Sequence, residues 1–141
     1  MLSSEERSFV MRRRVARLGT VDSLPAPHVV PVCYALAGDR IFIAIDEKPK
    51  SDDFRSLKRL RNVADNDRVC LTVDHYEDDW SHLGWVMIRG RASIAESGAA
   101  FPTALELLRE RYPAYRTMSL EDRPMIVIAI ERVTSWGDLD R

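Results

Sequence analysis

Short runs of β-branched and aromatic residues, separated by turn signals, recur along most of the chain and set its fold class. These runs cover residues 28–36, 40–45, 69–73, 85–92 and 125–130. Short strands without a helix after each one are typical of antiparallel architectures rather than of parallel α/β sheets. We therefore predict a single mainly β domain over residues 1–141, with about six strands closed into a barrel and about three flanking helices.

Helical signals lie at the N-terminus and between the strand runs. Ser3 and Glu6 match a capping box, which predicts a short amphipathic opening helix. Apolar residues at i+3 spacing predict a second helix over residues 53–64, and a third is expected at about residues 98–111. The helices should therefore cover the barrel rather than build it.

Glycines and prolines mark where the strands end or bend. Residues 19–27 are rich in turn formers, and the Gly38 region predicts a hairpin between the first two runs. Gly90 is expected at a β-bulge. Pro31 interrupts the first run, and because proline cannot donate to a strand ladder it belongs at a sheet edge or at a bulge.

Composition excludes several classes of protein. The 21 Lys and Arg nearly balance the 22 Asp and Glu, which argues against generic nucleic-acid binding. No apolar run approaches the roughly 20 residues that span a bilayer. The N-terminus does not resemble a signal peptide, and the two cysteines lie in apolar runs as small hydrophobes. A cytoplasmic protein without membrane partners is expected.

The sequence contains none of the common motifs that indicate an enzyme active site or a metal site. No glycine-rich nucleotide loop, nucleophile elbow or zinc-protease motif occurs. His28, His75 and His82 are far apart and share no metal-ligand spacing, so no metal site is predicted. The acids around His75 are interpreted as a solvated loop, because nothing there positions a nucleophile.

A basic stretch from Lys48 to Asn62 is the most suggestive chemical feature. It follows a strand, passes through Pro49 and Ser51, and enters a helix with further Lys and Arg residues. A loop leading into a helix offers backbone N–H groups and charged donors, which together can hold a phosphate. A helix that simply exposes solvated bases is an alternative that residue types alone do not exclude.

Two further groups have alternative interpretations. A proline bulge at Pro31 would free backbone groups for a planar heterocycle, or Pro31 would simply protect an edge strand. The tryptophans Trp80, Trp85 and Trp136 can line a cofactor site, but such residues also fill cores and dimer interfaces.

Several short motifs, each of low specificity alone, occur in an order that resembles a known family. The motifs are ARLGTVD (16–22), PHVVPV (27–32), DEKPK (46–50), LKRLRN (57–62), NDRV (66–69), DDWS (78–81) and IRGRA (88–92). In this order they resemble the pyridoxamine 5′-phosphate oxidase-like split-barrel proteins, and most closely their branch that uses the deazaflavin cofactor F420. The match covers about residues 15–95 and continues more weakly to Trp136.

The resemblance implies a six-stranded antiparallel Greek-key split barrel of the FMN-binding type, assembled as a homodimer with cofactor sites between the subunits. Carried onto this sequence, it assigns the cofactor phosphate to Lys50, Ser51, Arg59 and Asn62, with Lys48, Pro49 and Lys58 beside them. It assigns the ring system and the cofactor's other end to His28, Val30, Pro31, Val32, Ile45, Asp46, Trp80, Ser81 and Trp136.

The resemblance also implies an F420-dependent oxidoreductase that moves hydride between the reduced cofactor and a small, electron-poor organic substrate. No catalytic side chain is required, and a proton could come from Tyr34, His28 or water. An FMN-binding oxidase or reductase, an F420 carrier or sensor without turnover, and a haem-binding split barrel are the alternatives. The substrate pockets of true pyridoxamine phosphate oxidases are not matched, so vitamin B6 is not the expected substrate.

Overall fold

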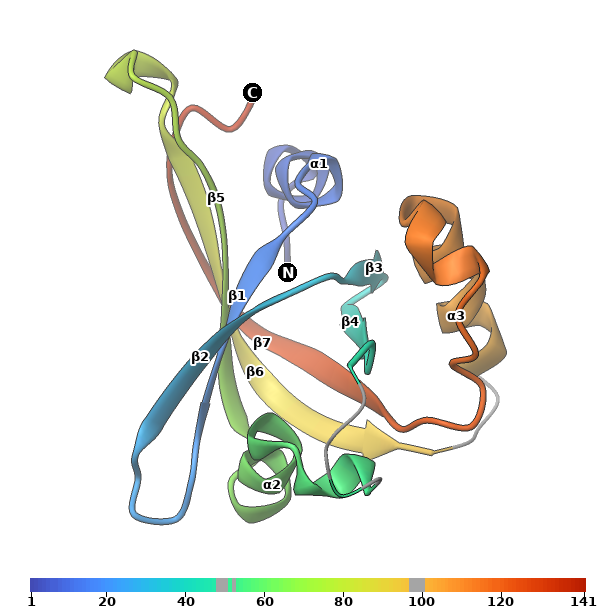
Figure 1. The fold of residues 1–141 in the computed structure, drawn as a ribbon. Helices are drawn as coiled ribbons and strands as arrows, with labels where there is room; N and C mark the ends of the chain where they lie inside the picture. The colour runs from blue at the N-terminus through green and yellow to red at the C-terminus, as the bar shows by residue number, and fades with distance from the viewer. Residues whose placement is uncertain (48–50, 52, 97–100) are drawn as a thin grey trace.

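The computed structural model describes residues 1–47, 51, 53–96 and 101–141, in which seven strands form one curled antiparallel sheet (Figure 1). The strands follow the order β2-β1-β5-β6-β7-β4-β3, so β2 and β3 are the two edges. The strands are β1 (Ala16–Val21), β2 (Pro27–Val32), β3 (Ala35–Ala37), β4 (Arg40–Ala44), β5 (Arg68–His75), β6 (Gly84–Ala95) and β7 (Met125–Gly137). The helices are α1 (Ser4–Arg12), α2 (Lys58–Asp65) and α3 (Phe101–Arg111), with 3₁₀ turns η1 (Phe54–Ser56), η2 (Trp80–His82) and η3 (Pro113–Arg116).

The predicted fold class is confirmed: the chain is a mainly β split barrel with flanking helices. The described strands number seven, where about six were expected. The difference arises in two places. Residues 19–21, expected in a turn, belong to β1, and the run at residues 28–36 is divided into β2 and β3.

The division between β2 and β3 has a clear cause at Tyr34. The backbone N–H of Tyr34 donates to the Tyr112 hydroxyl at 3.1 Å, and its carbonyl accepts from Arg111 Nε at 2.9 Å. Side chains of α3 and the residue that follows it thus take the backbone groups that a continuous strand would give to a neighbour. The chain can therefore turn from one sheet edge to the other at this point.

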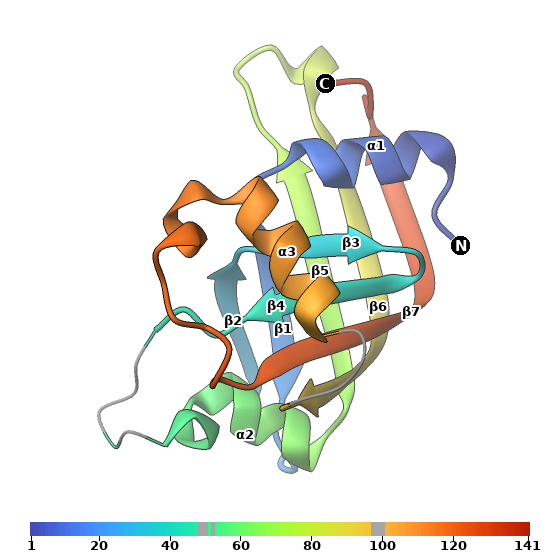
Figure 2. The same cartoon turned by 90° about the vertical axis from the view of Figure 1, so that its right-hand side faces the viewer.

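Two apolar clusters stabilise the fold. One fills the inside of the curled sheet, where Phe9 of α1 and Leu60 of α2 pack with Leu71 and Ile88 of the central strands. The other lies under α3, where Leu108 packs with residues of β3 and β4. Figure 2 shows α3 in front of β3 and β4, with α1 and α2 at opposite ends of the sheet.

The opening helix and the second helix start as their sequences predict, with one difference. Ser3 Oγ accepts from the Glu6 N–H at 3.1 Å, and Glu6 Oε1 accepts from the Ser3 N–H at 2.8 Å, so the capping box is confirmed. The helix expected over residues 53–64 is interrupted at Leu57, whose backbone is extended between η1 and α2. None of the helices among the described residues is long and apolar enough to cross a membrane.

The expected bulge near Gly90 is confirmed, but the extra residue belongs to the partner strand. Arg89 pairs with Arg132 while Gly90 pairs with Ile130, so Glu131 of β7 has no opposite residue in β6. The carbonyl oxygen of Ala129 approaches Gly90 so closely that a Cβ there would overlap it. Gly90 is thus the residue that lets β6 and β7 come together beside the bulge.

Tyr112→Phe should destabilise the chain because its hydroxyl contacts three backbone groups, which belong to Tyr34 and Arg14. That hydroxyl is 3.1 Å from the Tyr34 nitrogen and 3.0 Å from the carbonyl oxygens of Tyr34 and Arg14. Its removal leaves a buried backbone N–H unpaired, which costs about 1–3 kcal/mol. Urea unfolding would measure the loss. Tyr76→Phe is the control, since Tyr76 is exposed and should change the free energy of unfolding by less than about 0.5 kcal/mol. Equal effects of the two variants would contradict this account.

Candidate cofactor site

The predicted phosphate residues Arg59 and Asn62 are buried at the junction of α2 with the β1–β2 hairpin. They are three positions apart and therefore share a face of α2. Their exposed fractions are only 8% and 1%. Asn62 Nδ2 donates to Thr20 Oγ1 at 3.0 Å, and Thr20 pairs with His28 across the two strands. The fold thus connects Asn62, through Thr20, with the predicted ring-binding residue His28.

Unpartnered polar atoms are concentrated among these residues. Of the described side chains, four have a buried nitrogen or oxygen without a hydrogen-bond partner, and Arg59 Nε, Asn62 Oδ1 and His28 Nδ1 are three of them. Each such atom costs about 1–3 kcal/mol in the absence of a partner, so groups of them need an explanation. A ligand that supplies both hydrogen-bond donors and acceptors is the simplest one.

Neighbouring acids hold the basic residues of α2 in place. Arg59 Nη1 lies 2.6 Å from Glu47 Oε1, and Lys58 Nζ lies 3.3 Å from Asp22 Oδ2. The backbone N–H groups of Ala26 and then Leu24 hold the pKa of Asp22 below its usual value, with a smaller contribution from Lys58. Asp22 therefore stays ionised and ties α2 to the turn between β1 and β2.

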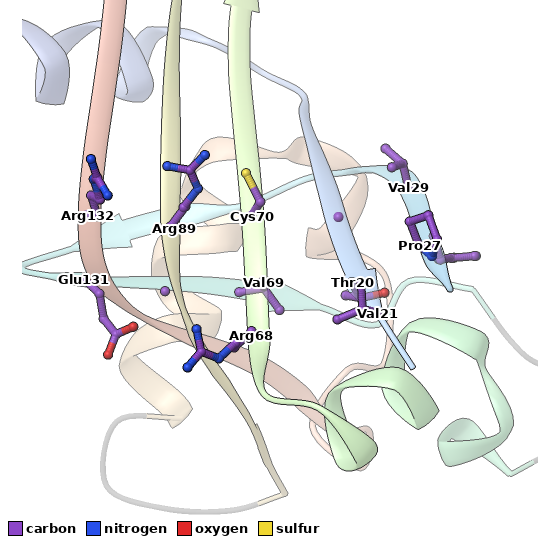
Figure 3. A pocket seen from close by; sticks show the side chains of 13 residues that line it. Thr20, Val21, Pro27, Val29, Arg68, Val69, Cys70, Arg89, Glu131 and Arg132 are labelled. Atoms are coloured by element: carbon purple, nitrogen blue, oxygen red, sulfur yellow. The ribbon is translucent and has the colours of Figure 1, made fainter. Parts of the chain in front are cut away.

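A surface pocket of about 550 Å³ adjoins this junction on the outer face of the sheet. It is bounded by residues of five strands, Thr20 and His28 among them, and its size is in the range of small-molecule sites. Figure 3 shows Cys70, Arg89 and Arg132 side by side on β5, β6 and β7. Arg68 also lines the pocket, and Glu131 is its one lining acid among the described residues.

The pocket chemistry is cationic rather than nucleophilic. Burial raises the pKa of the Cys70 thiol, so at neutral pH Cys70 is a neutral group and a poor nucleophile. The arginines Arg68, Arg89 and Arg132 were not singled out from the sequence. Their signal was present, since each occupies an outward position of a strand whose inward residues are apolar.

The predicted residues of β2 divide between the two faces of the strand. His28, Val30 and Val32 alternate along β2 and share its inward face, opposite Thr20, Leu18 and Ala16 of β1. Pro31 is exposed on the outer face. Val32 is 9% exposed and belongs to the apolar core inside the curled sheet.

Residues after β4 are placed only in part. Ile45 is fully buried in the core, and Asp46 is exposed and accepts a hydrogen bond from the Tyr115 hydroxyl at 2.5 Å. Burial, followed by this contact, raises the pKa of Tyr115. Ser51 Oγ is 2.7 Å from Ser56 Oγ. The predicted phosphate loop residues Lys48, Pro49 and Lys50 lie outside the described residues.

The turn η2, which contains Trp80 and Ser81, and the C-terminal end of β7, which contains Trp136, lie at the other end of the sheet from α2 (Figure 1). Trp80 and Ser81 follow β5, whose eight residues span roughly 23 Å from the end of α2. Trp136 pairs with Trp85 near the same end. Trp80 is 71% exposed and Trp136 is 54% exposed. One chain therefore does not bring these residues to Arg59 and Asn62.

Tyr34 is not placed to donate a proton to a bound substrate. Its side chain is fully buried, and its hydroxyl donates to the backbone carbonyls of Val10 and Arg13. Burial raises its pKa well above the usual value. Of the two residues considered as proton donors, His28 is the one that lines the pocket.

Comparison with known proteins identifies the family. The model of the family described as pyridoxamine 5′-phosphate oxidase matches residues 2–137, and the chain belongs to this family. A reductase of 5a,11a-dehydrotetracycline and 5a,11a-dehydrooxytetracycline from Streptomyces rimosus is 29% identical over 136 residues, covering 96% of this chain and 82% of that enzyme.

Two mycobacterial structures share the fold. The conserved hypothetical protein Rv2991 from Mycobacterium tuberculosis superposes with a TM-score of 0.78 at 23% identity, over 99% of this chain and 87% of that one. A heme binding protein from Mycobacterium smegmatis gives 0.77 at 20% identity, over 97% of this chain. This chain spans about half of that heme binding protein, since the match covers 54% of it.

Proposed function

We propose that this chain is an F420-dependent oxidoreductase that transfers hydride between the reduced deazaflavin and a small, electron-poor organic substrate. The observation that carries the proposal is the group of buried, unpartnered atoms Arg59 Nε, Asn62 Oδ1 and His28 Nδ1. When bound, the cofactor would supply the hydride, and the protein supplies binding, orientation and charge.

The unpartnered atoms fit a ribityl phosphate. Arg59 Nε can donate to a phosphate oxygen, and Asn62 Oδ1 can accept from a ribityl hydroxyl. His28 Nδ1 can take either role according to its tautomer. A bound phosphate would compete with Glu47 for the Arg59 guanidinium, whose planar donors suit phosphate as well as carboxylate. F420 and FMN share the ribityl phosphate, so FMN is the alternative cofactor.

The outer-face pocket supports an electron-poor substrate. Hydride addition to an activated double bond places negative charge on the substrate, and the nearby guanidinium groups of Arg68, Arg89 and Arg132 would stabilise it. The similar Streptomyces reductase acts, by its name, on dehydro forms of tetracyclines. The particular substrate of this chain is a separate question.

A homodimer would complete the site. The exposed Val29, Trp80 and Trp136 are large apolar groups on the sheet face and its far end. Because one chain holds the tryptophans apart from Arg59 and Asn62, a second copy is needed to bring Trp80 or Trp136 to the cofactor. Sedimentation equilibrium should give twice the mass of the chain.

Fluorescence titration of the purified protein tests the cofactor assignment. F420 is expected to bind more tightly than FMN and than haemin. Tighter binding of FMN would replace F420 as the cofactor, and tighter binding of haemin would replace the oxidoreductase proposal. If F420 binds but its reduced form is not oxidised in the presence of quinones, enones or tetrapyrroles, the chain is a carrier or sensor.

A further inference from the structure

The connection between β5 and β6 brings together two histidines and two acids within residues 75–82. His75 Nε2 lies 2.6 Å from Glu77 Oε2, and His82 Nδ1 lies 2.6 Å from Glu77 Oε1. Asp79 Oδ2 is 3.6 Å from the same His82 nitrogen. We call this group the tip cluster; its members are His75, Glu77, Asp79 and His82.

The ligand atoms of three of the four members are close enough to share one ion, and His75 is held beside them by Glu77. Atoms of Glu77, Asp79 and His82 all lie within 4.8 Å of one another. A tetrahedral zinc ion with bonds near 2.1 Å places its ligands roughly 3.4 Å apart. Shifts of about 1 Å or less in exposed side chains would therefore convert the hydrogen-bonded group into a coordination shell.

We propose that the tip cluster binds one divalent transition-metal ion of the zinc type. The His82 imidazole with the carboxylates of Glu77 and Asp79 matches the ligand preference of zinc, whereas calcium and magnesium prefer oxygen ligands alone. The cluster is accessible, since the side chains of His75 and His82 are 27% and 28% exposed. This proposal does not depend on the identity of the cofactor.

The present hydrogen bonds already orient the ligands. Glu77 accepts from both imidazoles through its two oxygens, and these contacts, His75 first, hold its pKa below the usual value. Asp79 Oδ1 accepts from the Ser81 hydroxyl at 2.7 Å and from its N–H at 3.1 Å, which leaves Oδ2 facing His82. The cluster is thus ordered before any ion binds.

The positive charge of Arg141 lies beside His82 and should weaken metal binding. Its Nη2 is 2.9 Å from each ring nitrogen of His82, and a guanidinium can only donate. When His82 donates from Nδ1 to Glu77, its Nε2 can accept from Arg141. Coordination through Nδ1 would place the proton on Nε2, against the positive charge of Arg141. Removal of that charge should therefore tighten metal binding.

The tip cluster was not predicted from the sequence, because the spacing of His75 and His82 matches no common metal-binding motif. His75 is the last paired residue of β5, opposite Gly84 of β6, and His82 belongs to η2 just before that strand. The hairpin brings the two ends of the connection together, so ring nitrogens seven positions apart meet at one carboxylate.

Zinc titration of the tag-free full-length chain, in competition with a zinc-binding indicator dye, tests the proposal. One equivalent of Zn²⁺ should bind, and His82→Ala and Glu77→Gln should each weaken binding at least tenfold. Asp78→Asn is the matched control, since it removes a charge from the same loop outside the cluster, and it should change the dissociation constant less than about threefold. Arg141→Gln should tighten binding several-fold.

Three results would overturn the site. Absence of saturable zinc binding would show that the cluster is only a hydrogen-bonded network. An equal loss in Asp78→Asn and His82→Ala would show a diffuse attraction to the acidic loop. Binding of Ca²⁺ or Mg²⁺ as tight as that of Zn²⁺ would show that the His82 imidazole is not a ligand. Circular dichroism of each variant would confirm that the sheet is retained.

Discussion

Gly90→Ala should lower the free energy of unfolding by about 3 kcal/mol, at the upper end of the usual cost of overpacking. The added methyl group would overlap the carbonyl oxygen of Ala129 and press on the Ile128 side chain. The oxygen belongs to the backbone of β7, so it cannot rotate away as a side chain would. For a domain of this size the midpoint of thermal unfolding should fall by about 10 °C.

Gly19→Ala is the matched control for Gly90→Ala. Gly19 lies in β1 of the same sheet, and a methyl group there would meet only ordinary contacts with Cys70, the nearest at 3.5 Å. Its expected effect is within about 1 kcal/mol, and it can be stabilising because alanine restricts the unfolded chain. Similar losses in the two variants would mean that glycine flexibility, rather than close approach of β6 and β7, matters at Gly90.

Arg59→Ala should weaken F420 binding about 10- to 100-fold, the loss expected for a buried, charge-assisted hydrogen bond. Asn62→Ala should also weaken binding, to a smaller degree, because it removes a neutral acceptor. Isothermal titration would measure both. Arg61→Ala is the control, since Arg61 carries the same charge on the exposed side of α2.

Glu47→Gln separates a binding role of Arg59 from a structural one. The substitution keeps the size of the side chain but removes the carboxylate that lies 2.6 Å from Arg59 Nη1. If the guanidinium binds the phosphate, affinity for F420 should hold or rise. If Arg59 only anchors α2, Glu47→Gln should destabilise the chain as Arg59→Ala does. The affinity of the folded protein for F420 should then be the same in both variants as in the unchanged chain.

The strands were predictable from local patterns, and their ends were not. The runs that became β4, β5, β6 and β7 carry β-branched residues between turn signals, and all were located. The error at residues 19–21 arose because Gly19 and the prolines that follow suggested a turn, whereas pairing with both β2 and β5 keeps this segment extended. The break at Tyr34 depends on Tyr112, 78 positions away, and no local pattern contains that information.

The candidate site was predictable only where the family motif carried it. Arg59 and Asn62 were assigned through the resemblance, and their burial was not expected, since Arg59 could equally have been a solvated base. The outward arginines of the pocket come from three strands that pair only after folding. The tip cluster was missed for the same reason, because spacing along the chain does not measure distance across a hairpin.

The prolines of β2 also limit how this protein can associate. Pro27 and Pro31 stand four residues apart on an edge strand, so their nitrogens point to the same side as that of Val29. Proline is tolerated in a strand where that side faces outward, and two of these three positions then lack an N–H group. A foreign strand would find almost no donors along this edge. Extension of the sheet from chain to chain, the first step toward fibrils, is therefore blocked at β2.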